Sequence, residues 1–145
     1  MFDLLDIVLL RNTKTFYDLP ARIKQDWRAN TSYRELVNLY RFATAVSTVP
    51  GDFAELGVFR GGTAKLLAEA DQSRTVHLFD TFTGIPEATA GVDGMGIGDC
   101  CCPLDAVRAY IGLQSRVADH VGRCPDSSAE LERLRFTLVN LDADQ

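Results

Sequence analysis

The 145-residue sequence lacks several features that mark large classes of protein. Basic residues are in deficit, with 15 Lys and Arg against 20 Asp and Glu, which gives a net charge of −5. A chain of that charge is unsuited to a broad nucleic-acid surface and has no electrostatic attraction to an anionic membrane. Internal repeats and low-complexity tracts are also absent. We therefore expect a single globular domain with neither nucleic acid nor membrane as its partner.

A long hydrophobic run is missing as well. The apolar stretch near the N-terminus, residues 2–10 (FDLLDIVLL), is short, contains Asp3 and Asp6 and follows no basic region. A membrane span needs about 20 apolar residues, and a secretory signal needs a basic segment before its apolar core. The stretch fits neither, so we expect a cytoplasmic protein.

The four cysteines lack the spacing of a metal site. Cys100, Cys101 and Cys102 are consecutive, Cys124 lies downstream, and no C-x-x-C occurs. Adjacent cysteines rarely pair with each other, and a cytoplasmic protein keeps its thiols reduced. We expect thiols in loops rather than a zinc or redox centre.

The first 50 residues have a helical pattern. Ser32 and Glu35 have the S-x-x-E spacing of a capping box, and Pro50-Gly51 ends the apolar face that follows. We expect residues 1–50 to form a helical lid or support for residues 51–145. The aromatic residues of this segment are expected to pack in the core or the lid rather than to stack on a substrate: Trp27, Tyr33 and Tyr40.

From Asp52 onward, short apolar runs alternate with amphipathic segments. The pattern predicts strands at 53–58, 75–79, 117–121 and 136–141, and helices at 63–70 and 103–111. A long glycine-containing loop, 81–102, separates two of these elements, and residues 127–130 fit either a brief helix or a loop. Strands separated by helices imply a parallel sheet. The predicted fold class is α/β.

Three acidic residues lie at or near the ends of predicted strands. Glu55 is within the first strand, Asp80 follows the second and Asp142 follows the fourth. In an open parallel sheet, ligands bind outside the carboxyl ends of the strands. The sequence therefore predicts a ligand site at this edge.

The turn after the first strand is rich in glycine but has no dinucleotide fingerprint. Residues 57–62 (GVFRGG) lack the G-x-G-x-x-G spacing of nicotinamide enzymes. The glycines allow a ligand to approach the backbone, and the helix N-terminus that follows favours a negative group such as a carboxylate. Asp80, about twenty residues on, suits the two hydroxyls of a ribose. Together they indicate a nucleotide-type ligand.

These motifs resemble the macrocin O-methyltransferase family. The similar segments are GDFAELGVFRGGTAKLLAEA, HLFDTFTGIPE and RFTLVNLDAD, within a resemblance that runs from about Thr31 to Asp144. The family comprises class I S-adenosylmethionine-dependent enzymes that methylate sugar hydroxyls during antibiotic biosynthesis. The resemblance implies a Rossmann-like sheet, S-adenosylmethionine as cofactor and a small glycosylated acceptor.

The resemblance also assigns roles to individual residues. The methionine end of the cofactor would be held by Glu55, Gly57, Arg60, Gly61, Gly62 and Thr63. Asp80 would bind the ribose, and Phe82 would either flank the adenine or pack in the core. Asp142 would bind Mg²⁺ and accept the hydroxyl proton, with Asp144 as its support; Mg²⁺ lowers the pKa of a sugar hydroxyl and orients it.

Plainer interpretations stay open for several of these residues. Asp142 lies where solvated carboxylates are common, and Arg60 also fits an ion pair with a surface acid. His77 is expected to be a packed core histidine, whereas His120 either lines the acceptor pocket or has a structural role.

Members of the family continue beyond the last acidic motif, so the resemblance implies a domain that is incomplete at its C-terminus. We expect the fourth strand to be an exposed edge, and the chain to be inactive or weakly stable unless a partner or a second copy covers that edge. Two other functions remain open: a non-catalytic cofactor-binding or interaction remnant, and a nicotinamide-dependent oxidoreductase.

Overall fold

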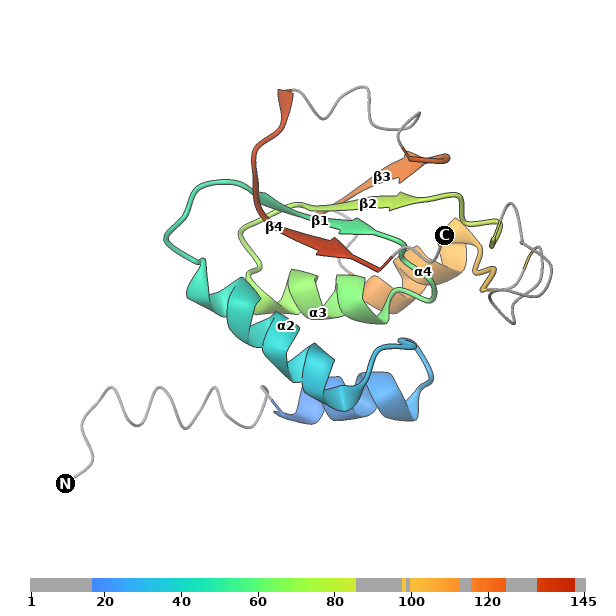
Figure 1. Ribbon diagram of the computed structural model, residues 1–145, viewed down its shortest axis with the longest axis horizontal. Coiled ribbons are helices and arrows are strands. Elements are labelled where there is room, and N and C mark those ends of the chain that lie inside the picture. Colours follow the sequence, from blue (N-terminus) through green and yellow to red (C-terminus); the bar gives the residue numbers. More distant parts are fainter. Residues whose placement is uncertain (1–16, 86–97, 99, 113–115, 125–132, 143–145) are drawn as a thin grey trace.

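A four-stranded parallel sheet in the order β3-β2-β1-β4 forms the centre of the computed structural model (Figure 1). The structure describes residues 17–85, 98, 100–112, 116–124 and 133–142. The strands are β1 (Asp52–Leu56), β2 (Val76–Asp80), β3 (Val117–Val121) and β4 (Phe136–Leu141). The predicted α/β class is confirmed, and each of the four predicted strands is present.

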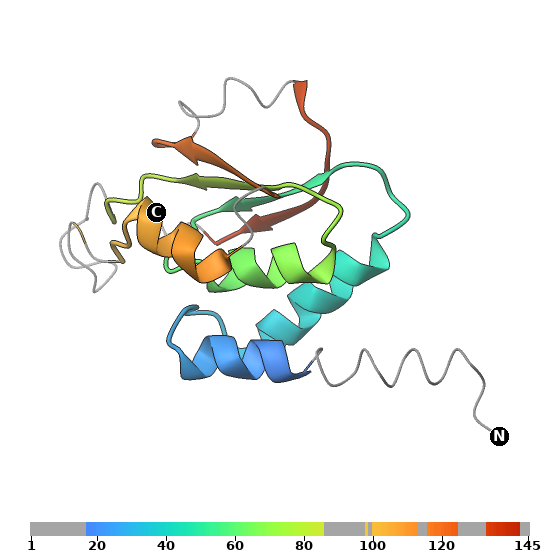
Figure 2. The ribbon, with the colours of Figure 1, turned by 180° about the vertical axis from the view of Figure 1, so that it is seen from behind.

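The helices lie on one side of this sheet, as the two opposite views show (Figures 1 and 2). They are α2 (Tyr33–Ala45), α3 (Gly62–Ala70) and α4 (Leu104–Ile111), and residues 17–25 are also helical. Within the described residues, none of these helices has the length and apolar character needed to span a membrane. Cys101, Cys102 and Cys124 are free thiols, as predicted.

The core has two parts, which meet at α3. One part joins the sheet to α3 and α4 and includes Phe53, Leu67 and Leu78, none of which is exposed. The other joins α2, α3 and residues 17–29. Successive residues of a strand point to opposite faces, and consecutive residues are buried in β1 and β2, so these central strands are covered on both faces. The N-terminal helices therefore share apolar contacts with the sheet domain.

Both ends of α2 are satisfied by side chains. At its start the predicted capping box is present, since Ser32 accepts from the Glu35 amide and Glu35 accepts from the Ser32 amide. At its end Arg74, only 9% exposed, donates to the carbonyls of Val46 and Ser47 and also to that of Gly51. Nε of the same side chain binds Asp71 at 2.6 Å. Arg74 thus fixes the chain that leads from α2 into β1.

Replacing Arg74 should destabilise the fold without touching the ligand edge. The variant Arg74→Met keeps the apolar stem but leaves these carbonyls and the Asp71 carboxylate without their cation. We expect the free energy of unfolding to fall by about 2 kcal/mol, measured by urea denaturation. The exposed Arg34 on α2 provides the control, because Arg34→Met should change stability by less than about 0.5 kcal/mol. An equal loss in both variants would contradict this role.

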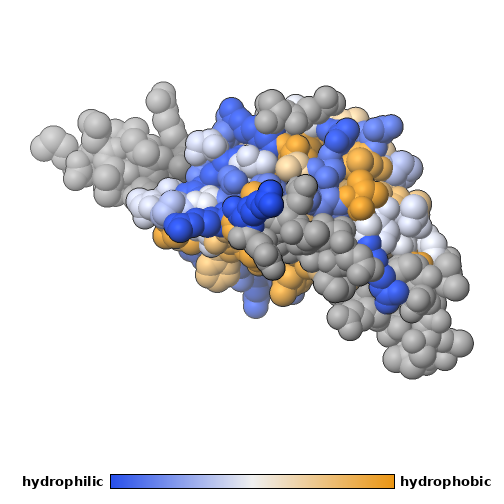
Figure 3. Space-filling model, turned by 90° about the horizontal axis from the view of Figure 1, so that it is seen from above, coloured by the Kyte–Doolittle hydropathy of each residue, from blue (hydrophilic) through white to orange (hydrophobic). Residues whose placement is uncertain are grey.

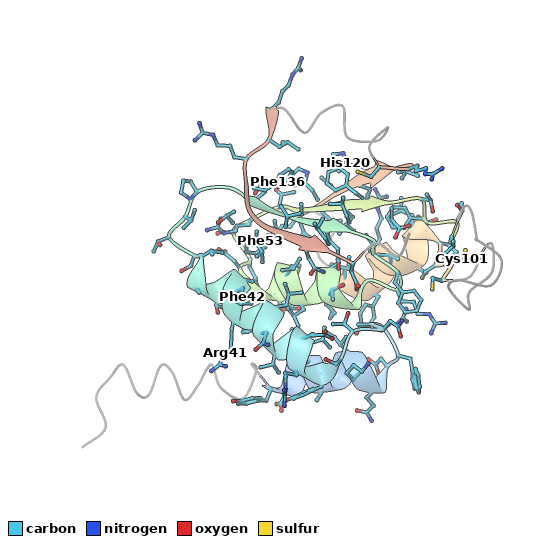
Figure 4. All side chains as sticks on the ribbon, in the orientation of Figure 1. Arg41, Phe42, Phe53, Cys101, His120 and Phe136 are labelled. Atoms are coloured by element: carbon cyan, nitrogen blue, oxygen red, sulfur yellow. The ribbon has the colours of Figure 1, made fainter. Side chains whose placement is uncertain are left out.

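The face of the sheet opposite the helices carries a group of stacked rings. His120 stacks on Phe79 with 4.2 Å between ring centroids, and its Nε2 lies 3.0 Å from Nδ1 of His77. His77 also contacts the edge of Phe136, which Figure 4 shows on this side of the sheet with His120. These contacts support the expectation that His77 is a core residue, and they favour the structural role for His120.

Hydrophobic side chains are exposed on the same face, as Figure 3 shows. By strand alternation this face of β4 carries Val139 and Leu141, which are 46% and 72% exposed. Among the described residues, β4 has a paired neighbour on one side only, as expected for an edge strand. The proposed short helix at 127–130 and most of the loop 81–102 lie outside the described residues.

Candidate functional site

Glu55 occupies the centre of the predicted ligand edge and is completely buried. Oε1 accepts a hydrogen bond from Nδ2 of Asn140 on β4 at 3.1 Å, while Oε2 finds no hydrogen-bond partner in the described part of the chain. Burial raises the pKa of Glu55 to about 8; the side chains of Thr63 and Asn140 act against this, and the charges of Asp142 and Asp80 add to it. At neutral pH this site therefore holds a protonated carboxyl with an unused oxygen.

Asp80, at the carboxyl end of β2, is held by backbone amides. Oδ2 accepts from the amide of Val58 at 2.6 Å and from that of Phe59 at 3.4 Å, and Oδ1 accepts from the amide of Phe82 at 2.8 Å. The first two amides belong to the glycine-rich turn after β1. A carboxylate has about four acceptor positions, so Asp80 keeps room for a further donor. Its position relative to the turn is thereby fixed.

The turn between β1 and α3 requires glycine at two points. Gly57 has a φ of 83° and Gly61 a φ of 78°, a left-handed conformation that glycine adopts without the steric penalty of a side chain. Gly61 is the N-cap of α3 and supplies no capping side chain. The N-terminus of α3 thus begins next to Glu55 and Asp80, with Thr63 in its first turn only 4% exposed.

A segment from the N-terminal region, residues 27–31, lies against this turn; we refer to it as the strap. The carbonyl of Arg28 accepts from the amide of Gly62 at 3.1 Å, and the carbonyl of Trp27 accepts from Nη1 of Arg60 at 3.3 Å. Arg60 is exposed, and its guanidinium also lies 5.0 Å from the ring centre of Phe59. Arg60 is therefore joined to the strap, and it forms no ion pair with any acid among the described residues.

The far end of the strap reaches Asp142. This exposed residue directly follows β4, its amide donates to the carbonyl of Leu56, and Oδ2 accepts from the hydroxyl of Thr31 at 3.1 Å. The Asp142 carboxylate is therefore tied to the N-terminal region and not to the sheet alone. Asp144, its predicted support, lies outside the described residues.

Phe82 is placed in the core rather than at an open ligand surface. Its side chain is 7% exposed and belongs to the apolar cluster between the sheet and α4. Of the two roles predicted from the sequence, packing is the one that these contacts favour. Its φ of 56° shows that the backbone just after Asp80 is itself constrained.

Two contacts of the site were missed by reasoning from the sequence. Asn140, which binds Glu55, is a polar residue inside an apolar strand, and the need of buried polar groups for partners could have marked it. Thr31, which binds Asp142, carries no comparable signal because 111 residues separate the two in sequence. Within the described residues no group of three His, Cys, Asp or Glu side chains is arranged to hold a metal ion.

Comparisons with known proteins match the part of the chain that contains this site. Residues 27–97, which include the strap, the glycine-rich turn and Asp80, match the family model of macrocin O-methyltransferase (TylF). In fold, the chain is similar to CalS11, a calicheamicin methyltransferase, with a TM-score of 0.59, 19% identity and coverage of 98% of this chain and 68% of that one.

Two sequence relatives are named as O-methyltransferases. The chain is 30% identical over 150 residues to the 8-demethyl-8-(2,3-dimethoxy-alpha-L-rhamnosyl)-tetracenomycin-C 4′-O-methyltransferase of Streptomyces olivaceus, covering 86% of this chain and 57% of the relative. It is 37% identical over 81 residues to the demethyldecarbamoylnovobiocin O-methyltransferase of Streptomyces niveus, covering 48% of this chain and 30% of the relative. The sequence spans little more than half the length of the first of these proteins. In its glycine-rich turn, its strand-end acids and its sequence over residues 27–97, the chain is similar to the macrocin O-methyltransferase family.

Proposed function

We propose that the protein is an S-adenosylmethionine-dependent O-methyltransferase that methylates a sugar hydroxyl of a natural product, with Mg²⁺ assisting. The observation that carries the proposal is the convergence of Glu55, Asp80 and the glycine-rich turn at the carboxyl edge of the sheet, with Asp142 beside them. Similarity to the family supports the methyl transfer, and the rhamnosyl group in the name of one relative supports the sugar acceptor.

The described residues fit the two ends of S-adenosylmethionine. The buried Oε2 of Glu55, which has no hydrogen-bond partner among the described residues, would suit an ammonium group once the carboxyl ionises. The left-handed Gly57 and Gly61 leave the turn without side chains that would block a ligand. Asp80, oriented by three amides, keeps acceptor capacity for ribose hydroxyls. S-adenosylmethionine would supply a sulfonium methyl group that is already activated for transfer.

The protein then has to align the acceptor hydroxyl and remove its proton. Asp142 is an exposed carboxylate on the same edge of the sheet, held in place by the hydroxyl of Thr31, and it is our candidate for accepting that proton. Carboxylate oxygen is the ligand type that Mg²⁺ prefers. Asp142 is the one carboxylate that we assign to this role, and within the described residues no group of three His, Cys, Asp or Glu side chains is arranged to hold the ion.

A second candidate is a non-catalytic module that binds the cofactor. It is supported by the number of described polar groups suited to a cofactor, Glu55, Asp80 and the turn amides, whereas Asp142, bound by Thr31, is the one described carboxylate that we propose for proton transfer from the acceptor. A nicotinamide-dependent oxidoreductase is disfavoured because the turn lacks the G-x-G-x-x-G spacing.

Titration calorimetry with S-adenosylhomocysteine, S-adenosylmethionine and NAD separates the cofactor classes, and methyl transfer to phenyl α-L-rhamnoside separates catalysis from binding. We expect the adenosyl ligands to bind and NAD not to bind. NAD binding without adenosyl ligands would overturn the proposal, and cofactor binding without transfer to any rhamnoside would favour the binding module.

The variant Asp80→Asn should weaken the binding of S-adenosylhomocysteine by about 10- to 100-fold. An amide has one acceptor oxygen in place of two, so it cannot serve the turn amides and a ribose hydroxyl together, and a hydrogen bond to a charged group contributes about 1.5–3 kcal/mol. Asp105, in the first turn of α4, is the matched control, and Asp105→Asn should bind the ligand as the wild type does. Equal affinities in wild type and Asp80→Asn would contradict the assignment.

A further inference from the structure

Trp27 lies where the helical residues 17–25 end, in a backbone conformation that favours glycine. Its φ is 52°, its amide donates to the carbonyl of Lys24 at 3.2 Å, and the next amide, that of Arg28, donates to the carbonyl of Ile23 at 3.1 Å. This pair of bonds is the Schellman motif, whose left-handed position is usually glycine. A bulky side chain there is strained.

The indole is also poorly buried. Trp27 is 78% exposed, the largest value among the exposed large hydrophobic residues of the described chain. Our sequence-based expectation that Trp27 packs in the core or the lid is therefore wrong. Backbone strain and an exposed aromatic surface both oppose folding, and glycine at this position would avoid both. The part of the fold that the structure describes thus gives no reason for a tryptophan here.

The backbone around Trp27 is nevertheless fixed to the functional site. Arg60 binds the Trp27 carbonyl, and Gly62 binds the Arg28 carbonyl. The Arg28 guanidinium lies 4.3 Å from the ring centre of Tyr110 on α4, which holds the strap from a second side. Because Thr31 at the other end binds Asp142, the strap runs from the glycine-rich turn to the carboxylate that we propose as the proton acceptor. The exposed ring of Trp27 therefore belongs to the end of the strap that is fixed to the glycine-rich turn.

We infer that Trp27 is a specificity-determining residue that binds the acceptor, whose flat ring face stacks on the indole. This inference rests on the proposed methyl transfer. The acceptor is the better assignment than the cofactor, because the groups suited to the cofactor are a completely buried Glu55 and an Asp80 held by backbone amides, whereas the indole is exposed to solvent. An indole binds the apolar face of a sugar or of an aromatic ring through its own π-face.

The chain contains a single tryptophan, so its fluorescence reports on Trp27 alone. We expect phenyl α-L-rhamnoside, added to the protein saturated with S-adenosylhomocysteine, to shift the emission to shorter wavelength. Methyl α-L-rhamnoside, which lacks the aryl ring, shows which part of the acceptor stacks on the indole. A shift equal to that with phenyl α-L-rhamnoside would mean that the sugar stacks on it, and a smaller shift would mean that the aromatic ring does. S-adenosylhomocysteine alone should leave the emission unchanged; a shift with this ligand alone would make Trp27 a cofactor contact and overturn the inference.

The variant Trp27→Gly separates a role in binding from a role in folding. Glycine suits the left-handed position, so the melting temperature should be equal to or higher than that of the wild type. The KM for phenyl α-L-rhamnoside should rise about tenfold, as expected for the loss of one stacking contact, with kcat and the affinity for S-adenosylhomocysteine little changed. Phe42→Ala, at a 62% exposed aromatic residue of α2, is the control and should leave KM unchanged.

Two results separate this inference from the proposed function. A wild-type protein that binds no adenosyl ligand and transfers no methyl group would overturn the proposed function and this inference with it. A Trp27→Gly variant that methylates the rhamnoside with the KM of the wild type would overturn the inference alone.

Discussion

The variant Glu55→Gln should be more stable than the wild type at neutral and alkaline pH, although it removes a residue from the centre of the ligand edge. Glutamine has nearly the same shape as a protonated glutamate, and its Oε1 can accept the same hydrogen bond from Asn140. It never ionises, so it avoids the cost of keeping a carboxyl group in a completely buried position. Stability measured by urea denaturation across pH tests this expectation.

The direction of the pH dependence follows from the raised pKa of Glu55. The carboxyl has a pKa of about 8 in the folded protein against 4.5 as its ordinary value, so between these limits the folded state binds a proton that the unfolded state has lost. Wild-type stability therefore falls as pH rises from about 4.5 to about 8 and then levels off. At 1.36 kcal/mol for each pKa unit, the cost at pH 7 is about 3 kcal/mol, which Glu55→Gln should recover.

Glu35 provides a control of opposite sign. It is exposed, and its hydrogen bonds with Ser32 hold its pKa below the ordinary value. Glu35→Gln should therefore be less stable than the wild type at neutral pH, with the deficit disappearing as the pH falls through the lowered pKa. If wild type and Glu55→Gln instead showed the same pH dependence between 5 and 8, Glu55 would not be a buried neutral carboxyl.

Binding of the cofactor should release the proton that Glu55 holds in the folded protein at neutral pH. If the ammonium group of S-adenosylhomocysteine pairs with Glu55, the carboxyl must ionise, and binding at pH 7 should release up to one proton. Calorimetry in buffers of different ionisation enthalpy measures this number, and Glu55→Gln should release none and bind more weakly. A gain in stability together with a loss of affinity is the pattern of a group kept for function.

The sequence was informative about the sheet because local patterns determine it. Short apolar runs predicted β1 to β4, and the carboxyl ends of parallel strands necessarily share one edge, so Glu55 and Asp80 could be placed together from the sequence alone. The Ser32 cap was also readable, since a capping box spans only four residues. These features depend on neighbours in sequence or on sheet topology alone.

The strap was not readable from the sequence, because it depends on tertiary contacts. The Gly62 amide donates to the Arg28 carbonyl, and the Thr31 hydroxyl donates to Asp142, but no periodic pattern in the sequence predicts either hydrogen bond. Trp27 was misjudged for a related reason: a tryptophan is usually at least partly buried, and only the backbone geometry shows that this one sits at a glycine position. Such departures from local preference tend to occur at functional sites.

The variant Gly62→Ala should be the most damaging single-methyl change at the site. A Cβ on Gly62 would lie 2.6 Å from the carbonyl oxygen of Arg28 and 2.8 Å from Cγ2 of Ile23, and the first of these is backbone that cannot turn aside. Either the strap or the N-terminus of α3 must move, which breaks the hydrogen bond between Gly62 and Arg28. We expect the free energy of unfolding to fall by about 3 kcal/mol, measured by urea denaturation.

Gly112 separates this contact from the general cost of replacing glycine. It has a φ of 73°, and no described atom lies within 4 Å of the position that a Cβ would take, so Gly112→Ala tests left-handed strain alone and should cost about 1 kcal/mol. Gly62 has no such φ, so its larger loss would come from the strap. If the strap also positions Trp27 for the acceptor, Gly62→Ala protein that remains folded should show altered Trp27 fluorescence and a raised KM for the rhamnoside. If Gly62→Ala were as stable as the wild type, the strap would not be in close contact with the glycine-rich turn.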